Sequence, residues 1–196
     1  MFLITHTNTK AMSATESTML PLGTLAPKFM LVEPSTGQIR SLDELKSEKA
    51  TLVMFICNHC PFVKHVNPQL VALANDYLPQ GVSIIAISSN DVESYPDDSP
   101  IKMAETAQRL GYPFPYLYDD TQDVARAYHA ACTPDFFLFD GTMKLVYRGQ
   151  LDSSRPSNSI PVDGCDLRRA IDAVLAGKKV DEHQQPSIGC NIKWKG

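Results

Sequence analysis

Apolar residues follow two patterns along this chain, continuous runs and helical spacing, and the clearest examples of both lie in its first half. Residues 52–56 form a continuous apolar run, which predicts a strand buried on both faces. From Pro61 to about residue 78, apolar side chains recur at helical spacing instead. A second apolar run at 82–88 predicts another buried strand of the parallel type. The order strand–helix–strand therefore predicts a parallel pair at the centre of a sheet.

Shorter elements are expected around this unit. Ser41 followed by Glu44 has the spacing of a capping box and predicts a short helix to about residue 48. Asp140-Gly141 is a typical hairpin turn. Strands are expected at 29–32, 38–40, 116–118, 136–139 and 144–148, and further helices at 101–110, 121–128 and 166–176. This order predicts an α/β sandwich, in which a mixed sheet flanked by helices has parallel strands at its centre and an antiparallel hairpin at one edge.

Two cysteines lie where the first buried strand gives way to the helix, in the segment Cys57-Asn58-His59-Cys60-Pro61. Open α/β sheets place their functional sites at this carboxyl end of the strands. Free N–H groups and the positive end of the helix dipole are expected to favour a thiolate at Cys57. With two residues between them, one helical turn brings the sulfurs within disulfide reach. These features predict Cys57 as the more exposed nucleophile and Cys60 as its resolving partner.

His59 lies between the two cysteines and, when protonated, is expected to stabilise the neighbouring thiolate. A stabilised thiolate favours the reduced form, so the pair should be a relatively oxidising couple. Known couples span about −270 to about −120 mV, and the upper half of that range is expected here.

Length and composition indicate one globular domain of ordinary size. The 196 residues are 43% hydrophobic and 20% charged, which allows a core without disulfide staples. A net charge of −4 without a basic stripe argues against a nucleic-acid partner. No apolar run reaches membrane-spanning length. Residues 1–20 are expected to form a flexible arm, and residues 21–196 a single domain with an added β-hairpin near its start and an extended tail at 178–196.

Cysteine usage and the N-terminal sequence indicate a reducing compartment. A secretory signal needs a basic start and a longer apolar stretch than this N-terminus has, so a cytoplasmic location is expected. The five cysteines are an odd number without the rhythm of a disulfide framework, which favours a catalytic or redox pair. No phosphate-cradling glycine loop is visible, and no organic cofactor is expected.

A second signal lies far along the chain, where Thr133-Pro134 directly precedes an apolar strand. Together with Cys57-x-x-Cys60 at the strand–helix junction, it resembles the thioredoxin superfamily. More narrowly, it resembles the redoxin branch, which includes AhpC/TSA-type peroxiredoxins and thiol–disulfide oxidoreductases. The resemblance covers roughly residues 20–176.

The resemblance implies a thioredoxin-like sandwich in which the bond before Pro134 is cis and faces the cysteine pair. That geometry gives an extended partner peptide a backbone surface on which to dock. The chemistry of proline agrees, since only X–Pro bonds adopt cis at low cost and a proline at a strand's first residue loses no ladder bond. The residues expected to support the catalytic cysteines are His59, Pro61, Thr133 and Pro134.

Three departures from the family pattern bear on the chemistry. Ile56 stands where thioredoxins carry a tryptophan. Thr51 stands where they carry a buried acid, which leaves the proton acceptor for Cys60 unassigned. The peroxiredoxin pattern Pro-x-x-x-Thr-x-x-Cys is absent, because Met54 precedes Cys57 by three positions. Since that threonine hydroxyl helps to position peroxide, its absence weakens the peroxidase interpretation.

Other cysteines and acids admit plainer interpretations. Cys132 lies two residues before Pro134, and Cys190 lies in a tail that can fold back, so a Cys132–Cys190 or Cys60–Cys190 exchange would form a relay. Two buried or idle thiols are the simpler alternative. Cys165, at a helix start, has no expected role. The acidic residues of the loop at 90–100 are expected to be solvated, and they are Asp91, Glu93, Asp97 and Asp98.

The sequence thus predicts a thiol–disulfide oxidoreductase in which Cys57 and Cys60 cycle between dithiol and disulfide. Its partners would be a protein or small-molecule disulfide or thiol and an external reductant, without nucleic acid or membrane, and it would act as a monomer or homodimer. One alternative is a thiol peroxidase that uses the same cysteines. Another is a zinc or copper carrier, with His129 or His183 as a distant copper ligand.

Overall fold

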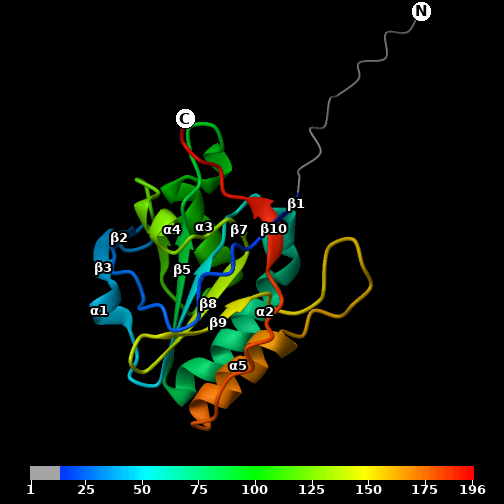
Figure 1. Cartoon of the computed structure of the whole chain (residues 1–196). Coiled ribbons are helices and arrows are strands. Elements are labelled where there is room, and N and C mark those ends of the chain that lie inside the picture. The colour runs from blue at the N-terminus through cyan, green and yellow to red at the C-terminus, as the bar shows by residue number, and fades with distance from the viewer. Residues whose placement is uncertain (1–13) are drawn as a thin grey trace, which may run out of the picture.

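A mixed seven-stranded sheet runs through the protein in the order β3-β2-β6-β5-β4-β8-β9 (Figure 1). The computed structural model describes residues 14–196. The strands of this sheet are β2 (Met30–Glu33), β3 (Gln38–Ser41), β4 (Ala50–Phe55), β5 (Val82–Ser88), β6 (Tyr116–Tyr118), β8 (Asp135–Asp140) and β9 (Leu145–Gly149). The predicted α/β sandwich is confirmed, with the β8–β9 hairpin at one edge and the β2–β3 hairpin at the other.

Strand β4 lies inside the sheet, between β5 and β8, and all six of its side chains are buried. It pairs in parallel with β5, where Leu52 lies opposite Ile84, and antiparallel with β8, where Leu52 lies opposite Leu138. A strand that is apolar at every position can be buried on both faces, which is what the unbroken run at 52–56 predicts. The carboxyl end of β4 therefore lies between two neighbouring strands, in the interior of the sheet and not at an edge strand.

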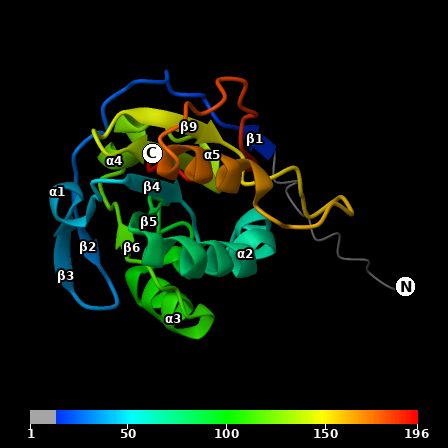
Figure 2. The same ribbon diagram turned by 90° about the horizontal axis from the view of Figure 1, so that it is seen from below.

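Helices cover both faces of the sheet (Figure 2). One face packs against α2 (Pro61–Tyr77), α3 (Pro100–Leu110) and α5 (Cys165–Leu175), which contribute Leu70, Met103 and Ile171 to its core. The other face packs against α1 (Leu42–Leu45) and α4 (Asp123–Ala127). Ser41 caps α1 by accepting the backbone N–H of Glu44 at 3.2 Å, as its spacing predicts. No helix within residues 14–196 is long and apolar enough to cross a membrane.

A second, three-stranded sheet joins the two ends of the described chain in the order β1-β10-β7. Its strands are β1 (Ala14–Glu16), β7 (Cys132–Thr133) and β10 (Ile188–Asn191). Residues 14–20, expected in a flexible arm, instead form β1 and bury Ser17 and Leu20; residues 1–13 of that expected arm lie outside the described residues. The tail was likewise not expected to form a strand. Ala-Thr-Glu in β1 and Ile-Gly-Cys-Asn in β10 carry neither an apolar run nor an alternating pattern, so pairing with distant segments creates these strands.

Candidate active site

The two cysteines flank the junction between β4 and α2, as the sequence predicts, but Cys60 and not Cys57 occupies the start of the helix. Cys60 is the N-cap of α2, and Pro61 follows at the first helical position, where its missing N–H costs nothing. The backbone N–H of Val63, in the first turn, donates to the Cys60 sulfur. The favourable end of the helix therefore acts on Cys60.

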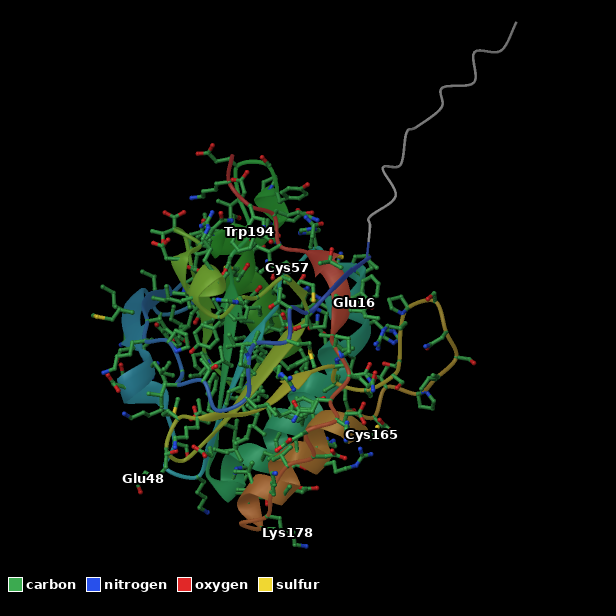
Figure 3. All side chains as sticks on the ribbon, in the orientation of Figure 1. Glu16, Glu48, Cys57, Cys165, Lys178 and Trp194 are labelled. Carbon is green, nitrogen blue, oxygen red and sulfur yellow. The ribbon has the colours of Figure 1, made fainter. Side chains whose placement is uncertain are left out.

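Both thiols are buried, and Cys57, expected to be the more exposed of the two, is so by only a small margin. Cys57 is 2% exposed and Cys60 is completely covered. The cover includes the tail strand, because Cys190 of β10 packs into the same buried cluster. Figure 3 shows Cys57 beside this strand, while Cys165 lies well away at the start of α5. The sequence could not predict this burial, since the covering segment lies 130 residues further along the chain than Cys60.

Hydrogen bonds within the cluster decide which sulfur carries a negative charge. The pKa of Cys60 is lowered, first by a hydrogen bond with the Cys190 thiol and next by one with Cys57. The pKa of Cys57 is raised, first by its hydrogen bond with Cys60, then by burial and by the nearby charge of Asp98. A thiolate is thus favoured on Cys60 in this closed arrangement, which reverses the preference expected from the sequence.

Thr133 contacts both cysteines from the opposite side of the site. Its Oγ1 lies 3.4 Å from Cys57 Sγ, and its carbonyl oxygen lies 3.2 Å from Cys60 Sγ, where it accepts the S–H whenever Cys60 is protonated. The Thr133–Pro134 peptide bond is cis, as the resemblance implies. These contacts place the two segments singled out in the sequence, about 75 positions apart, on either side of one site.

His59 connects the pair to a buried acid that the sequence analysis assigned to a solvated loop. His59 Nδ1 lies 4.0 Å from Cys57 Sγ and 2.5 Å from Asp98 Oδ2. The ring of Tyr95 stacks on the imidazole, with 5.2 Å between the ring centres. Because the His59 side chain retains 15% exposure and contacts Cys57, the Cys57 sulfur lies only one side chain below the surface.

Asp98 uses both carboxylate oxygens. Oδ1 accepts the backbone N–H groups of Asn58 at 2.8 Å and His59 at 3.2 Å, and Oδ2 accepts Asn90 Nδ2 at 2.8 Å. Burial by itself would raise the pKa of Asp98, but hydrogen bonds from His59 and Asn90 outweigh it and lower the pKa. Asp98 is therefore an ionised acceptor, and His59 Nδ1 carries the proton it receives. The expectation for Asp91, Glu93 and Asp97 is not affected, but for Asp98 it was wrong.

A second buried acid, Asp135, follows Pro134 directly and was also missed. Its Oδ2 accepts the Ala131 N–H at 3.4 Å, whereas Oδ1 has no hydrogen-bond partner. Burial raises its pKa to about 7. The only sequence signal was an acid at the head of a strongly apolar strand, where buried acids are rare.

We expect Asp135→Asn to stabilise the protein at neutral and alkaline pH. The folded pKa of about 7 lies above the ordinary value of 3.8, so ionisation favours the unfolded chain as pH rises between these values. The gain should be near zero below pH 4 and reach roughly 2–4 kcal/mol above pH 7, at about 1.4 kcal/mol per pKa unit. Urea unfolding of both proteins across this pH range would measure it. A gain that does not change with pH would contradict the burial of an ionisable carboxyl.

The ligands of the alternative copper site, the two cysteines with His129 or His183, do not come together among the described residues. Among residues 14–196, one group of three potential metal ligands comes together, Cys57, His59 and Asp98, with all donor atoms within 4.8 Å of one another. His129 and His183 are exposed and do not belong to it. Since His59 Nδ1 already donates to Asp98, the group forms a hydrogen-bonded histidine–carboxylate pair beside a thiol.

Comparisons with known proteins identify the family of this chain. The family model described as AhpC/TSA family matches residues 22–148. The thiol-disulfide oxidoreductase ResA of Geobacillus kaustophilus (strain HTA426) is 27% identical over 139 residues, which cover 70% of this chain and 75% of ResA.

Two solved structures extend the comparison to the fold. An uncharacterized conserved protein from Geobacillus kaustophilus has a TM-score of 0.93 and 62% identity, covering 94% of this chain and 97% of that one. The thioredoxin domain of a thiol-disulfide oxidoreductase from Bacteroides vulgatus has a TM-score of 0.55 and 23% identity, covering 66% and 88%. The second likeness supports the thioredoxin-like fold alone.

Proposed function

This chain belongs to the AhpC/TSA family, and from that premise we propose that it is a thiol–disulfide oxidoreductase whose Cys57 and Cys60 cycle between dithiol and disulfide. The observation that carries the proposal is the contact between the two thiols, bracketed by Thr133. Sulfurs that already share a hydrogen bond need little movement to form a disulfide. The relative ResA of Geobacillus kaustophilus is named a thiol-disulfide oxidoreductase, which supports the same reaction.

The reaction begins with a proton transfer inside the pair. Cys60 is the favoured thiolate and Cys57 its hydrogen-bond donor, so moving that proton to Cys60 leaves the thiolate on Cys57. Cys57 is the sulfur that contacts the partly exposed His59, which makes it the one that a partner reaches first. Its thiolate attacks a partner disulfide and forms a mixed disulfide, releasing one partner thiolate.

Cys60 completes the cycle. It gives its proton to the partner thiolate released in the first step and, now a thiolate, attacks the Cys57 sulfur of the mixed disulfide. The Cys57–Cys60 bond forms, the bond to the partner breaks, and the second partner sulfur leaves as a thiolate. The partner disulfide has then gained two electrons, and the enzyme's dithiol has lost them. An external reductant restores the dithiol.

The closed tail restricts which partners enter. Strand β10 pairs with β7, on the backbone edge that an extended partner peptide would use. A small disulfide reaches Cys57 past the side chains of His59 and Tyr95, which shift to admit it. A protein partner needs the edge of β7 and must therefore displace β10. Faster reduction of a small disulfide than of a protein disulfide follows from this arrangement.

A side-by-side assay tests the proposal. The reduced protein should reduce a small disulfide, and more slowly a protein disulfide, with one disulfide reduced per pair. Consumption of hydrogen peroxide with a thiol donor is measured in parallel. Peroxide consumption without disulfide reduction would replace the proposed function by a thiol peroxidase. Bound zinc or copper in the protein purified under reducing conditions, with neither activity, would replace it by a metal carrier.

A further inference from the structure

The tail strand β10 lies directly over the cysteine pair. It runs between β1 and β7 and crosses in front of α2 (Figure 1). Cys190 lies opposite Thr133, the residue whose carbonyl oxygen lies 3.2 Å from Cys60 Sγ. Gly189 permits this approach, because a Cβ at that position would lie 2.0 Å from the Thr133 carbonyl oxygen.

The tail is also bound to the histidine–carboxylate pair. The side chain of Asn90 accepts the Lys193 N–H at 2.9 Å and donates to Asp98 at 2.8 Å. The Lys193 carbonyl in turn accepts the Asp91 N–H at 2.8 Å and Gln122 Nε2 at 2.8 Å. These contacts at Lys193, together with the pairing of β10 with β1 and β7, hold the strand in one position over the site.

Three thiols consequently share one buried cluster. Cys60 is the common neighbour. Cys57 and Cys190 belong to its buried cluster and both act to lower its pKa, and Cys190 pairs with Thr133, whose carbonyl oxygen lies 3.2 Å from Cys60 Sγ. The Cys190 backbone N–H also donates to the Cys60 sulfur. Cys190 is 1% exposed, so its nearest reaction partner is Cys60 and not a molecule in solution.

We propose that Cys190 is a third redox cysteine, which accepts the disulfide from the pair by exchange at Cys60. The Cys190 thiolate attacks Cys60 Sγ in the Cys57–Cys60 disulfide. The Cys60–Cys190 bond forms, the Cys57–Cys60 bond breaks, and Cys57 leaves as a thiolate that takes up the proton lost by Cys190. No net oxidation occurs in this step, and the first disulfide comes from the proposed function.

The state of Cys60 controls the timing of this exchange. In the dithiol form, the Cys190 thiol is held protonated, chiefly by its hydrogen bond to the Cys60 thiolate. Once Cys60 is in a disulfide it carries no charge, so the largest cause of the raised Cys190 pKa disappears and burial alone continues to raise it. Cys190 is thus a better nucleophile after the pair is oxidised than before.

Cys132, the other cysteine near the cis proline, does not fit this role. It precedes Thr133 on β7, and neighbouring residues of a strand point to opposite faces. Cys190 lies opposite Thr133, so Cys132 and Cys190 point to different sides of the small sheet. The Cys132 S–H donates to the carbonyls of Pro134 at 3.6 Å and Ser187 at 3.9 Å.

The exchange would change what the site can do. A Cys60–Cys190 disulfide ties β10 covalently to the start of α2 and closes the backbone edge at Thr133. At the same time it leaves Cys57 as a single free thiol. The oxidised enzyme would then exclude an extended peptide and react with small thiols at Cys57.

Disulfide mapping tests the exchange apart from turnover. The Cys57→Ser/Cys165→Ser protein is oxidised with diamide, quenched with acid and digested for mass spectrometry. We expect a Cys60–Cys190 disulfide as the main product, and its persistence when Cys132→Ser is added. Free Cys60 and Cys190 thiols, or a Cys60–Cys132 disulfide, would overturn the proposal.

The wild-type protein provides the second measurement, independent of how the variants fold. After oxidation by diamide, it should contain both Cys57–Cys60 and Cys60–Cys190 disulfides, and Cys190→Ser should contain only the first. A wild-type protein with Cys57–Cys60 alone would overturn the exchange. Because diamide supplies the oxidation, these results do not depend on the disulfide-reduction assay, whose failure would count against the proposed function alone.

Discussion

Replacing Cys57 with serine is expected to abolish disulfide reduction, whereas replacing Cys60 with serine should trap a mixed disulfide with the partner. A hydroxyl cannot replace a thiolate as the attacking group at neutral pH, so Cys57→Ser loses the first step. Cys60→Ser keeps that step but removes the sulfur that releases the partner. Since Cys60 and not Cys57 is the neighbour of Cys190, the tail cysteine does not substitute for it.

Steady-state reduction of a small disulfide and mass spectrometry of the intact protein together measure this prediction. Both variants should lose turnover, but only Cys60→Ser should gain the mass of the partner thiol. Cys165→Ser is the matched control, because Cys165 is exposed and lies outside the cluster. Trapping by Cys57→Ser instead would make Cys60 the attacking sulfur, in line with its lowered pKa and against the order of steps proposed here.

The second large effect is expected from Asp98→Ala. This substitution leaves His59, Asn90 and the N–H groups of residues 58 and 59 without their acceptor in a buried place. Removing one partner of a buried pair typically costs about 3–5 kcal/mol. For a protein of this size, that corresponds to a fall in Tm of roughly 6–20 °C.

Acid should reduce this difference between the wild type and Asp98→Ala. The folded pKa of Asp98 lies below its ordinary value of 3.8, so its stabilising contribution is complete above that value and is lost as pH falls through the folded pKa. Urea unfolding at pH 7 and at a series of values below pH 4 would show the two proteins converge.

Asp97→Ala serves as the control for this series. Asp97 is exposed, and only its backbone carbonyl contacts the site, by accepting Asn58 Nδ2 at 2.8 Å. Its stability should match the wild type within about 0.5 kcal/mol, as is usual for surface substitutions. An equal loss in both variants would indicate that loop disruption, and not the Asp98 hydrogen bonds, causes the effect.

Sequence alone determined the scaffold of this site. The unbroken apolar run of β4, the helical period after Pro61 and the Asp140-Gly141 turn are local signals, and each gave the correct element. They also placed Cys57 and Cys60 at the exit of a central strand. The Thr133–Pro134 segment was found from its motif, although its contact with the cysteines required the fold.

Tertiary structure alone decided how the site is covered and where its charge lies. Strands β1 and β10 carry no apolar run or alternating pattern, and they exist because distant backbone groups pair with them. Asp98 looked like any other acid of a polar loop until folding surrounded it with four donors. Cys60 rather than Cys57 holds the favoured thiolate because the Cys190 thiol, 130 residues away in sequence, comes to lie against it. Hydrophobic periods and turns are properties of neighbouring residues, whereas burial and pKa depend on what folding brings together.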